Sequence, residues 1–196
     1  IDQLEKLQEN LVKSHACGTG PDVPKDIVAL MLFLKVQSLS YGYSGVQVET
    51  VQRLIDLYNE CVYPRVFEMG SLGASGDLAP LAHLSLPLIG LGEVYDENHW
   101  VEASDANRKF NWPPIHLKAK EGLALLNGTQ FMSAYGIWSV HHAHRLLKMS
   151  NIIGALSLDV FDGRIEPFLH QVHDIRPHKG QGEVAKNVQT YLEGSQ

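Results

Sequence analysis

The chain contains 196 residues, with a formal net charge of −6 at pH 7 and a pI near 5.9. A chain of this length can bury one hydrophobic core, and its acidic balance argues against a nucleic-acid partner, which would favour a basic surface. No apolar run reaches the roughly 18 residues of a membrane-spanning helix, so we expect no membrane partner. Cys17 and Cys61 are expected to be reduced thiols, which favours a cytoplasmic protein.

Apolar residues recur at helical spacing along most of the sequence, which predicts a mainly α fold. Because the helical pattern starts at Ile1, the sequence is expected to be an excerpt from a longer chain. A first helix should end in the glycine- and proline-containing stretch 14–21. A second helix, over 27–39, is apolar on nearly every face and should be buried all round. Ser44 is predicted to cap a third helix, with Gln47 completing a capping box.

The second half of the sequence predicts one hairpin and further helices. Residues 92–101 suit a short β-hairpin, and residues 103–109 form one helical piece. The prolines at 113–114 mark a linker. A single long helix is expected over 131–158, and a last helix over 183–192.

The most informative stretch is GSLGASGDLAP, residues 70–80, in which three glycines at every third position lead into an apolar segment. Three familiar glycine-rich loops do not match it. A P-loop would end in Gly-Lys-Ser/Thr, and a nucleophile elbow would have a glycine where Asp77 stands. A dinucleotide-binding loop should follow a strand, and residues 63–67 make a poor one. A tight structural turn is the remaining alternative.

The order Ala74-Ser75-Gly76-Asp77 allows chemistry on the backbone itself. If the amide nitrogen of Gly76 attacks the carbonyl carbon of Ala74, a five-membered ring closes, and only glycine leaves that nitrogen unhindered. Loss of water from the ring and from the Ser75 side chain leaves an exocyclic methylidene, which is a strong electrophile. Asp77 is a candidate base for these steps.

This loop resembles that of the aromatic amino acid ammonia-lyases, whose 4-methylidene-imidazol-5-one (MIO) group is built from Ala-Ser-Gly. The longer run GSLGASGDLAPLAHLSLPLIGLGEVY carries the resemblance more specifically than the tripeptide does. The resemblance implies an MIO group formed autocatalytically from Ala74, Ser75 and Gly76.

The resemblance also implies the architecture and the partners. It implies an L-aspartase-like ammonia-lyase fold, in which an MIO-bearing region with a short β-hairpin, residues 1–112, packs on the start of a long-helix bundle, residues 113–196. A homotetramer with a small-molecule amino acid substrate is expected. Because the active sites of the family combine residues from several subunits, the excerpt alone is expected to be inactive.

Asn127 is the second candidate site residue. It lies in GLALLNGTQ, residues 122–130, which resembles the family's second signature. In that signature the asparagine contacts the MIO ring and the substrate, and its amide can donate to an oxygen that gains negative charge. The structural alternative is an N-cap of the following helix.

Ser14 and His15 form the third candidate, because they resemble the family segment that lines the substrate ring in members acting on histidine. Buried polar partners discriminate strongly for an imidazole, which both donates and accepts hydrogen bonds. The resemblance therefore implies non-oxidative elimination of ammonia from L-histidine to give urocanate, with His15 also a catalytic candidate. The alternatives are a tyrosine or phenylalanine ammonia-lyase, an aminomutase of the same family, or a non-catalytic helical scaffold.

The other histidines favour structural interpretations. His141, His142 and His144 share one predicted helix, but no carboxylate or cysteine completes a ligand set, so no metal site is expected. His83 follows the loop in an apolar segment and is expected to be a hydrogen-bonded core histidine. The family's tyrosine bases and carboxylate-binding arginine match no position in this stretch.

Overall fold

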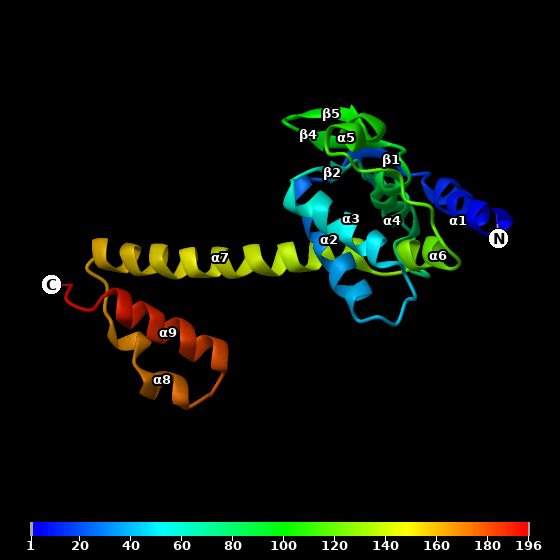
Figure 1. Cartoon of the computed structure of the whole chain (residues 1–196). Helices are drawn as coiled ribbons and strands as arrows, with labels where there is room; N and C mark the ends of the chain where they lie inside the picture. Colours follow the sequence, from blue (N-terminus) through cyan, green and yellow to red (C-terminus); the bar gives the residue numbers. More distant parts are fainter. Residues whose placement is uncertain (1, 196) are drawn as a thin grey trace. The chain divides into compact units, whose positions relative to one another are not determined.

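Helices dominate the computed structural model, which describes residues 2–195 (Figure 1). The mainly α fold predicted from the sequence is confirmed. Two units, Ile1–Trp138 and Ser139–Gln196, each have their own internal contacts and are described separately. Within the described residues, no helix is both long enough and apolar enough to cross a membrane. The partition into residues 1–112 and 113–196 remains a prediction.

The first unit contains six complete helices, one 3-10 turn and five short strands among its described residues. The helical segments are α1 (Asp2–His15), α2 (Lys25–Ser40), α3 (Val48–Asn59), α4 (Leu78–Ser85), η1 (Leu86–Ile89), α5 (Ala103–Lys109) and α6 (Glu121–Leu126). The strands are β1 (Thr19–Asp22), β2 (Tyr63–Pro64), β3 (Phe67–Met69), β4 (Glu93–Asp96) and β5 (His99–Glu102).

The long helix α7 (Gln130–Val160) begins in the first unit and continues into the second, and it confirms the single helix predicted over 131–158. The second unit also contains η2 (Glu166–Phe168), α8 (His170–Asp174) and α9 (Lys179–Tyr191). The helix α9 begins one turn before the predicted residue 183, and the short α8 was not predicted, because its polar, histidine-rich sequence has no apolar periodicity.

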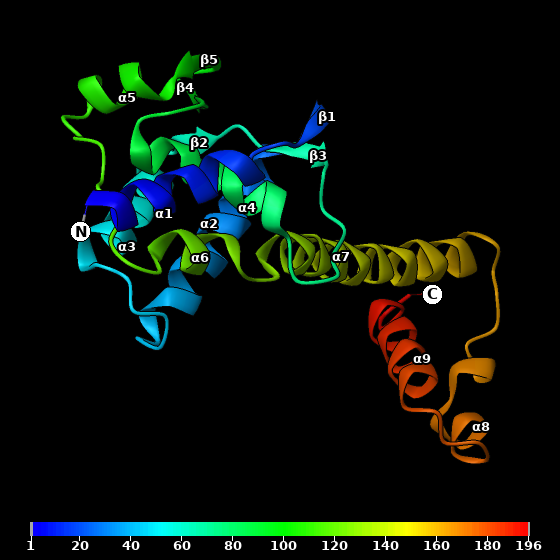
Figure 2. The same ribbon diagram turned by 90° about the vertical axis from the view of Figure 1, so that its right-hand side faces the viewer.

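Helix α2 forms the middle of the core of the first unit. Its side chains Ile27, Met31 and Leu32 are at most 1% exposed, and it packs beside α3 (Figure 1). Helices α1, α4 and α6 pack on one another, as Figure 2 shows. Each fully buried aliphatic side chain contributes about 1.5–3 kcal/mol to the stability of the fold relative to an exposed one. This burial stabilises the layer of helices, and the layer in turn supports the loop that precedes α4.

The strands form two small antiparallel sheets, β1-β3 and β2-β4-β5. The hairpin β4-β5 was predicted, and Glu97 and Asn98 turn it with φ angles of 44° and 72°, as a two-residue hairpin of primed type requires. The pairing of β1 with β3 was not predicted, because residues 19–22 look like a helix stop in the sequence and gain strand geometry only from their partner.

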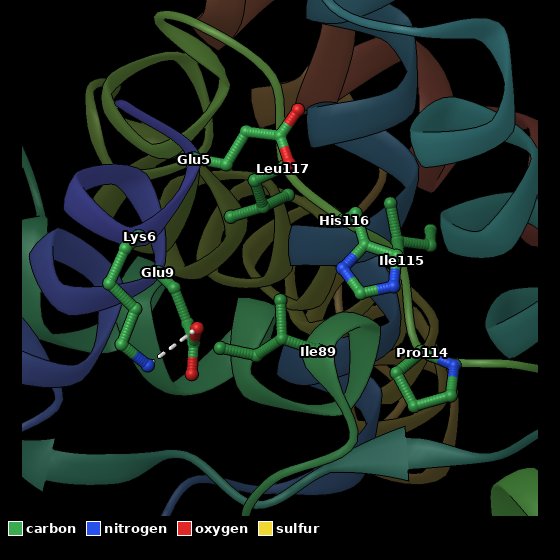
Figure 3. Close-up of a pocket in the computed structure, with 8 residues that line it drawn as sticks. All are labelled: Glu5, Lys6, Glu9, Ile89, Pro114, Ile115, His116 and Leu117. Carbon is green, nitrogen blue, oxygen red and sulfur yellow. Dashed lines mark hydrogen bonds and ion pairs between the residues drawn. The ribbon is translucent and has the colours of Figure 1, made fainter. Parts of the chain in front are cut away.

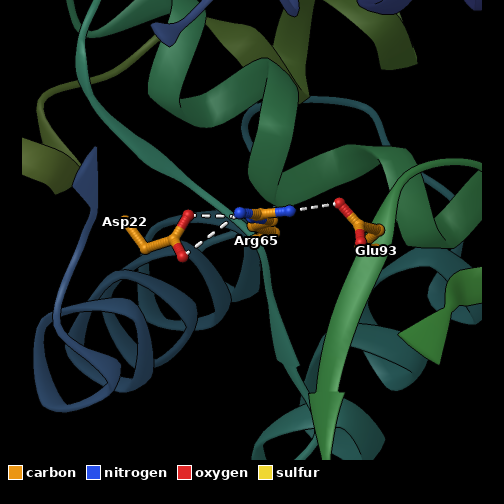
Figure 4. A network of polar contacts seen from close by, with 3 residues as sticks. All are labelled: Asp22, Arg65 and Glu93. Atoms are coloured by element: carbon orange, nitrogen blue, oxygen red, sulfur yellow. Dashed lines mark hydrogen bonds and ion pairs between the residues drawn. The ribbon is translucent and has the colours of Figure 1, made fainter. Parts of the chain in front are cut away.

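Arg65 links the two sheets (Figure 4). Its Nε donates to Asp22 Oδ1 at 2.8 Å and its Nη1 donates to Glu93 Oε2 at 2.6 Å. Hydrogen bonds to these carboxylates, first that of Asp22, raise the pKa of Arg65. Because Asp22 ends β1 and Glu93 begins β4, the guanidinium fixes the position of β1 and the chain that follows it into α2.

The capping box predicted at Ser44 and Gln47 is wrong. Gln47 is itself the N-cap residue of α3 and makes no side-chain cap hydrogen bond. Its backbone N–H and its Nε2 instead donate to the two carboxylate oxygens of Glu121, at 2.7 Å and 2.5 Å. A buried carboxylate supplied by α6 replaces the local cap, and the sequence around residue 44 contains no trace of it.

Glu121 is fully buried, and its carboxylate also accepts hydrogen bonds from Thr50 Oγ1 at 2.8 Å and from the Lys118 N–H at 2.6 Å. Replacing Glu121 with glutamine is expected to destabilise the fold by about 3 kcal/mol, because hydrogen bonds to a charged group contribute about 1.5–3 kcal/mol each and the new amide N–H faces donors. Urea unfolding measures the loss. As a control, Glu5→Gln, which alters an exposed ion pair, should leave the midpoint unchanged. Equal midpoints for all three proteins would contradict the prediction.

Candidate active site

The loop of residues 70–77 joins β3 to α4 and is held against the start of α7 by Asp77. The Asp77 N–H donates to the Gly128 carbonyl at 2.8 Å. Its Oδ2 accepts from the Met132 N–H at 3.0 Å, and its Oδ1 accepts from Ser71 Oγ at 3.0 Å. The side chain of Asp77 is 1% exposed. Its hydrogen bonds to Ser71 and Met132 fix both ends of this loop.

Gly76 occupies a position that admits no side chain. Its φ is +106°, and a Cβ built there would lie 2.6 Å from the Gly128 carbonyl oxygen and 3.1 Å from the Gly128 nitrogen. Residues other than glycine rarely adopt such a φ, and the contact with backbone leaves nothing that can move aside. The backbone of the loop at Gly76 is therefore packed directly on the backbone of Gly128.

A hollow of about 210 Å³ lies over this loop. It is lined from the loop by Ala74, Ser75 and Gly76, and from the end of α1 by Ser14 and His15. The structure thus brings together the first and third motifs of the sequence. Cys17 and the apolar residues Leu72, Leu78 and Ala79 also line the hollow. A cavity with apolar walls and few polar groups is the usual form of a small-molecule site.

His15 has a defined orientation in this hollow. Its Nδ1 lies 2.9 Å from the Leu11 carbonyl oxygen and 3.1 Å from Ser14 Oγ. Because a carbonyl oxygen only accepts, the proton belongs on Nδ1. In the neutral ring, Nε2 is then left as a hydrogen-bond acceptor, and such a group can bind or take the proton of a substrate.

Asn127 lies beside the loop but does not line the hollow. It is the C-cap residue of α6, with φ −83° and ψ 120°, and α7 begins only at Gln130, so the alternative of an N-cap is wrong. Its carbonyl oxygen accepts from Lys35 Nζ at 3.2 Å, and the next residue, Gly128, contacts Gly76.

Two polar residues near this peptide were not singled out in the sequence. Lys35 lies in the helix that is apolar on nearly every face, and its side chain is 1% exposed. Gln130 has a buried Oε1 with no hydrogen-bond partner among the described residues, and this atom lies 2.1 Å from the position that a Cβ of Gly128 would take. A lone charged residue at a core position of an apolar helix is the signal that could have identified Lys35.

His83 is a hydrogen-bonded core histidine, as predicted. Its Nε2 accepts from the Gly18 N–H at 3.0 Å, and its ring packs edge-on against Phe67 with centroids 5.0 Å apart. Burial lowers the pKa of His83 below its ordinary value of 6.5. Since His83 is on α4 and Gly18 follows the segment of Ser14 and His15, this bond holds the two walls of the hollow together.

The free energy of unfolding is expected to decrease as the pH is lowered, because the hydrogen bond that His83 accepts is lost when the ring is protonated. The pKa of His83 is lower in the folded than in the unfolded protein, so the unfolded protein binds more protons as the pH drops below 6.5. The contribution of His83 is therefore complete above pH 6.5 and is lost as the pH falls through the folded-state pKa. Comparing unfolding free energies of the wild type and His83→Asn across this range measures the effect. Identical pH slopes for both would contradict it.

A larger hollow of about 430 Å³ lies between α1 and residues 114–117 (Figure 3). Its charged groups already have partners. Glu9 accepts from Lys6 at 3.0 Å, and Glu5 accepts from Lys118 at 2.6 Å, a contact that lowers the pKa of Glu5. No residue of the loop lines this hollow, so the smaller hollow beside Ser75 is the candidate active site.

Comparisons with known proteins show the family of the chain. A sequence model of the family described as aromatic amino acid lyase matches residues 1–196. Histidine ammonia-lyase from Streptococcus pyogenes serotype M5 (strain Manfredo) is 46% identical over 191 residues, which are 97% of this chain and 37% of that protein. The chain thus spans little more than a third of the length of the curated relatives it matches.

Solved structures show the same fold. Histidine ammonia-lyase from Trypanosoma cruzi matches with a TM-score of 0.90 at 37% identity, over 96% of this chain and 37% of that one. Tyrosine aminomutase from Streptomyces globisporus matches with a TM-score of 0.92 at 36% identity, over 98% of this chain and 36% of that one. The chain therefore belongs to the aromatic amino acid lyase family.

Proposed function

We propose that the protein containing this chain is a histidine ammonia-lyase, which eliminates ammonia from L-histidine to give urocanate. The observation that carries the proposal is the hollow that Ser14 and His15 share with the Ala74-Ser75-Gly76 loop. A carbon-nitrogen lyase needs an electrophile and a group that recognises the side chain of the substrate. A candidate for each role lines this hollow, which supports the proposal.

The loop fits an MIO group. Ring closure needs an unhindered nitrogen at residue 76, and a glycine provides it. The close packing of Gly76 on Gly128, with a Cβ position 2.6 Å from the Gly128 carbonyl oxygen, supports a loop held in one conformation. When formed, the MIO supplies an electrophile for the amine of the substrate. Its precursor atoms belong to Ala74, Ser75 and Gly76. Asp77 holds the loop through both carboxylate oxygens, and it is also the candidate base for ring closure.

The other residues bind and orient the substrate. His15, with its proton on Nδ1, presents Nε2 to the imidazole or moves a proton there, and Ser14 fixes the His15 ring through its hydroxyl. The Asn127 amide is a donor for developing negative charge on the ring oxygen or for the substrate carboxylate. Further site residues belong to the rest of the protein, and the assembly is a cytoplasmic homotetramer.

The choice of histidine as substrate depends on sequence rather than fold. Lyase and aminomutase structures match this chain with similar TM-scores, so the fold does not separate the two reactions. The Ser14-His15 pair and the 46% identity to histidine ammonia-lyase favour the histidine reaction.

The test uses the full-length protein. Its intact mass should fall short by two waters, and digestion should map the deficit to the peptide with Ala74 to Asp77. The same protein is then incubated separately with L-histidine, L-tyrosine and L-phenylalanine, and the unsaturated acid and ammonia are measured. We expect urocanate from histidine and little product from the others. A full deficit with cinnamate or coumarate as the main product would contradict the substrate, and β-amino acids would indicate an aminomutase.

A further inference from the structure

Lys35 is a buried amine whose presence the packing of the core does not explain. Its side chain is 1% exposed on a helix that is otherwise largely apolar. Desolvation alone lowers the pKa of Lys35 to about 8, and no described carboxylate offsets it. Because a buried and unpaired charge destabilises a fold, an apolar residue here would give a more stable protein. A residue that is unfavourable for stability at such a position points to another role.

The contact of Lys35 indicates that role. Its Nζ donates to the Asn127 carbonyl oxygen at 3.2 Å. This oxygen belongs to the peptide bond that joins Asn127 to Gly128. The nitrogen of the same peptide lies 3.1 Å from the position of a Cβ on Gly76, and the Gly128 carbonyl accepts the Asp77 N–H at 2.8 Å. Gly128 therefore connects Lys35 with the loop that carries Ser75, since its nitrogen belongs to the peptide that Lys35 holds and its carbonyl to the next peptide.

We propose that Lys35 is a positioning residue for ring closure, because its hydrogen bond to the Asn127 carbonyl fixes the position of Gly128, the residue on which Gly76 packs. This inference rests on the proposed function. If Gly128 could move away, the loop would lose the support on which Gly76 packs and could adopt conformations that do not close the ring. A charge-assisted hydrogen bond from a buried amine is strong enough to prevent this movement.

The closure that Lys35 assists is a double dehydration. The Gly76 nitrogen bonds to the Ala74 carbonyl carbon, and the carbonyl oxygen leaves as water with the amide protons of Gly76 and Ser75. The Ser75 hydroxyl leaves as a second water with the proton of its own Cα. No oxidant or other reactant is consumed, so the reaction is followed by mass alone.

The experiment measures how fast freshly made full-length chains lose two waters. Chains produced by cell-free synthesis are sampled over time for intact mass, for the wild type and for Lys35→Met. We expect closure about tenfold slower in Lys35→Met, the scale of one lost hydrogen bond to a charged group. The melting temperature should be unchanged or higher, because the buried amine is gone, so slow closure is not a result of unfolding.

Two control variants separate positioning from packing. Leu32→Met alters a fully buried side chain on the same helix and should close at the wild-type rate. Lys35→Arg keeps a charged donor and should close faster than Lys35→Met. Wild-type speed in Lys35→Met, or equal slowing in Leu32→Met, would overturn the role of Lys35 and leave the lyase proposal intact. A wild type that never loses two waters would contradict both, whereas a wild type that closes without deaminating histidine would contradict the substrate alone.

Discussion

In the full-length protein, replacing Ser75 with alanine is expected to remove the proposed lyase activity while leaving the fold intact. Without the side-chain hydroxyl the second water cannot leave, so no methylidene forms and the mass deficit cannot reach two waters. Removing the covalent catalyst of an enzyme lowers turnover by about 10³-fold or more. Ser75 is exposed on the loop, and substitutions at such positions change stability by about 0.5 kcal/mol or less.

The measurement is the initial rate of urocanate formation by full-length Ser75→Ala, together with intact mass and the urea midpoint. The matched control is Ser71→Ala, which removes a hydroxyl from the same loop but one that only donates to Asp77. That variant keeps the other bond to the Asp77 carboxylate, from the Met132 N–H, so it should still form the ring and keep most of the activity. Wild-type turnover by Ser75→Ala would refute the MIO mechanism.

Replacing Gly76 with alanine is expected to affect both ring and stability. The new Cβ would lie 2.6 Å from the Gly128 carbonyl oxygen, on a backbone with φ +106°. A left-handed residue with a Cβ costs about 1–2 kcal/mol, and overpacking adds about 1–3 kcal/mol. We therefore expect a loss of about 3 kcal/mol, and the loop can relieve the clash only by moving away from Gly128. Ring closure should then fail.

Gly73→Ala separates the two causes of this loss. Gly73 is in the same loop with φ +68°, but a Cβ there meets nothing closer than the Met132 Cε at 3.6 Å. It should therefore lose only the about 1–2 kcal/mol of backbone strain and should still lose two waters. Urea unfolding and intact mass are measured on both variants. Equal losses in the two would show that backbone strain alone matters and that the contact with Gly128 does not shape the loop.

The two main variants test different statements about the same loop. Ser75→Ala leaves the backbone in place and removes the leaving group, whereas Gly76→Ala keeps the leaving group and disturbs the backbone. Both should fail to give the full two-water deficit, but only Gly76→Ala should also unfold at lower urea. This contrast distinguishes the chemistry of the loop from its packing.

Most secondary structure followed from local sequence, because helical periodicity and turn residues act within a few residues of one another. The helices predicted over 27–39, 103–109 and 131–158 are confirmed as α2, α5 and α7. The hairpin around residues 97–98 was found for the same reason. The prediction that the first of these helices is buried all round is wrong, because Phe33 of α2 is 53% exposed. The loop motif with Ser75 and its resemblance to the aromatic amino acid ammonia-lyases were also visible, since contiguous residues carry them.

What the tertiary structure alone decided depends on residues far apart in the chain. Only folding shows that Ser14 and His15 share a hollow with Ser75. The predicted cap at Ser44 does not form, because Gln47 binds a partner on another helix. The burial of Lys35 likewise depends on a distant partner, the Asn127 carbonyl. Periodicity reports which face of a helix is buried, but it does not report which distant donor or acceptor meets a polar group there. The sequence by itself therefore determined the elements and the reactive loop, and packing decided which side chains surround that loop.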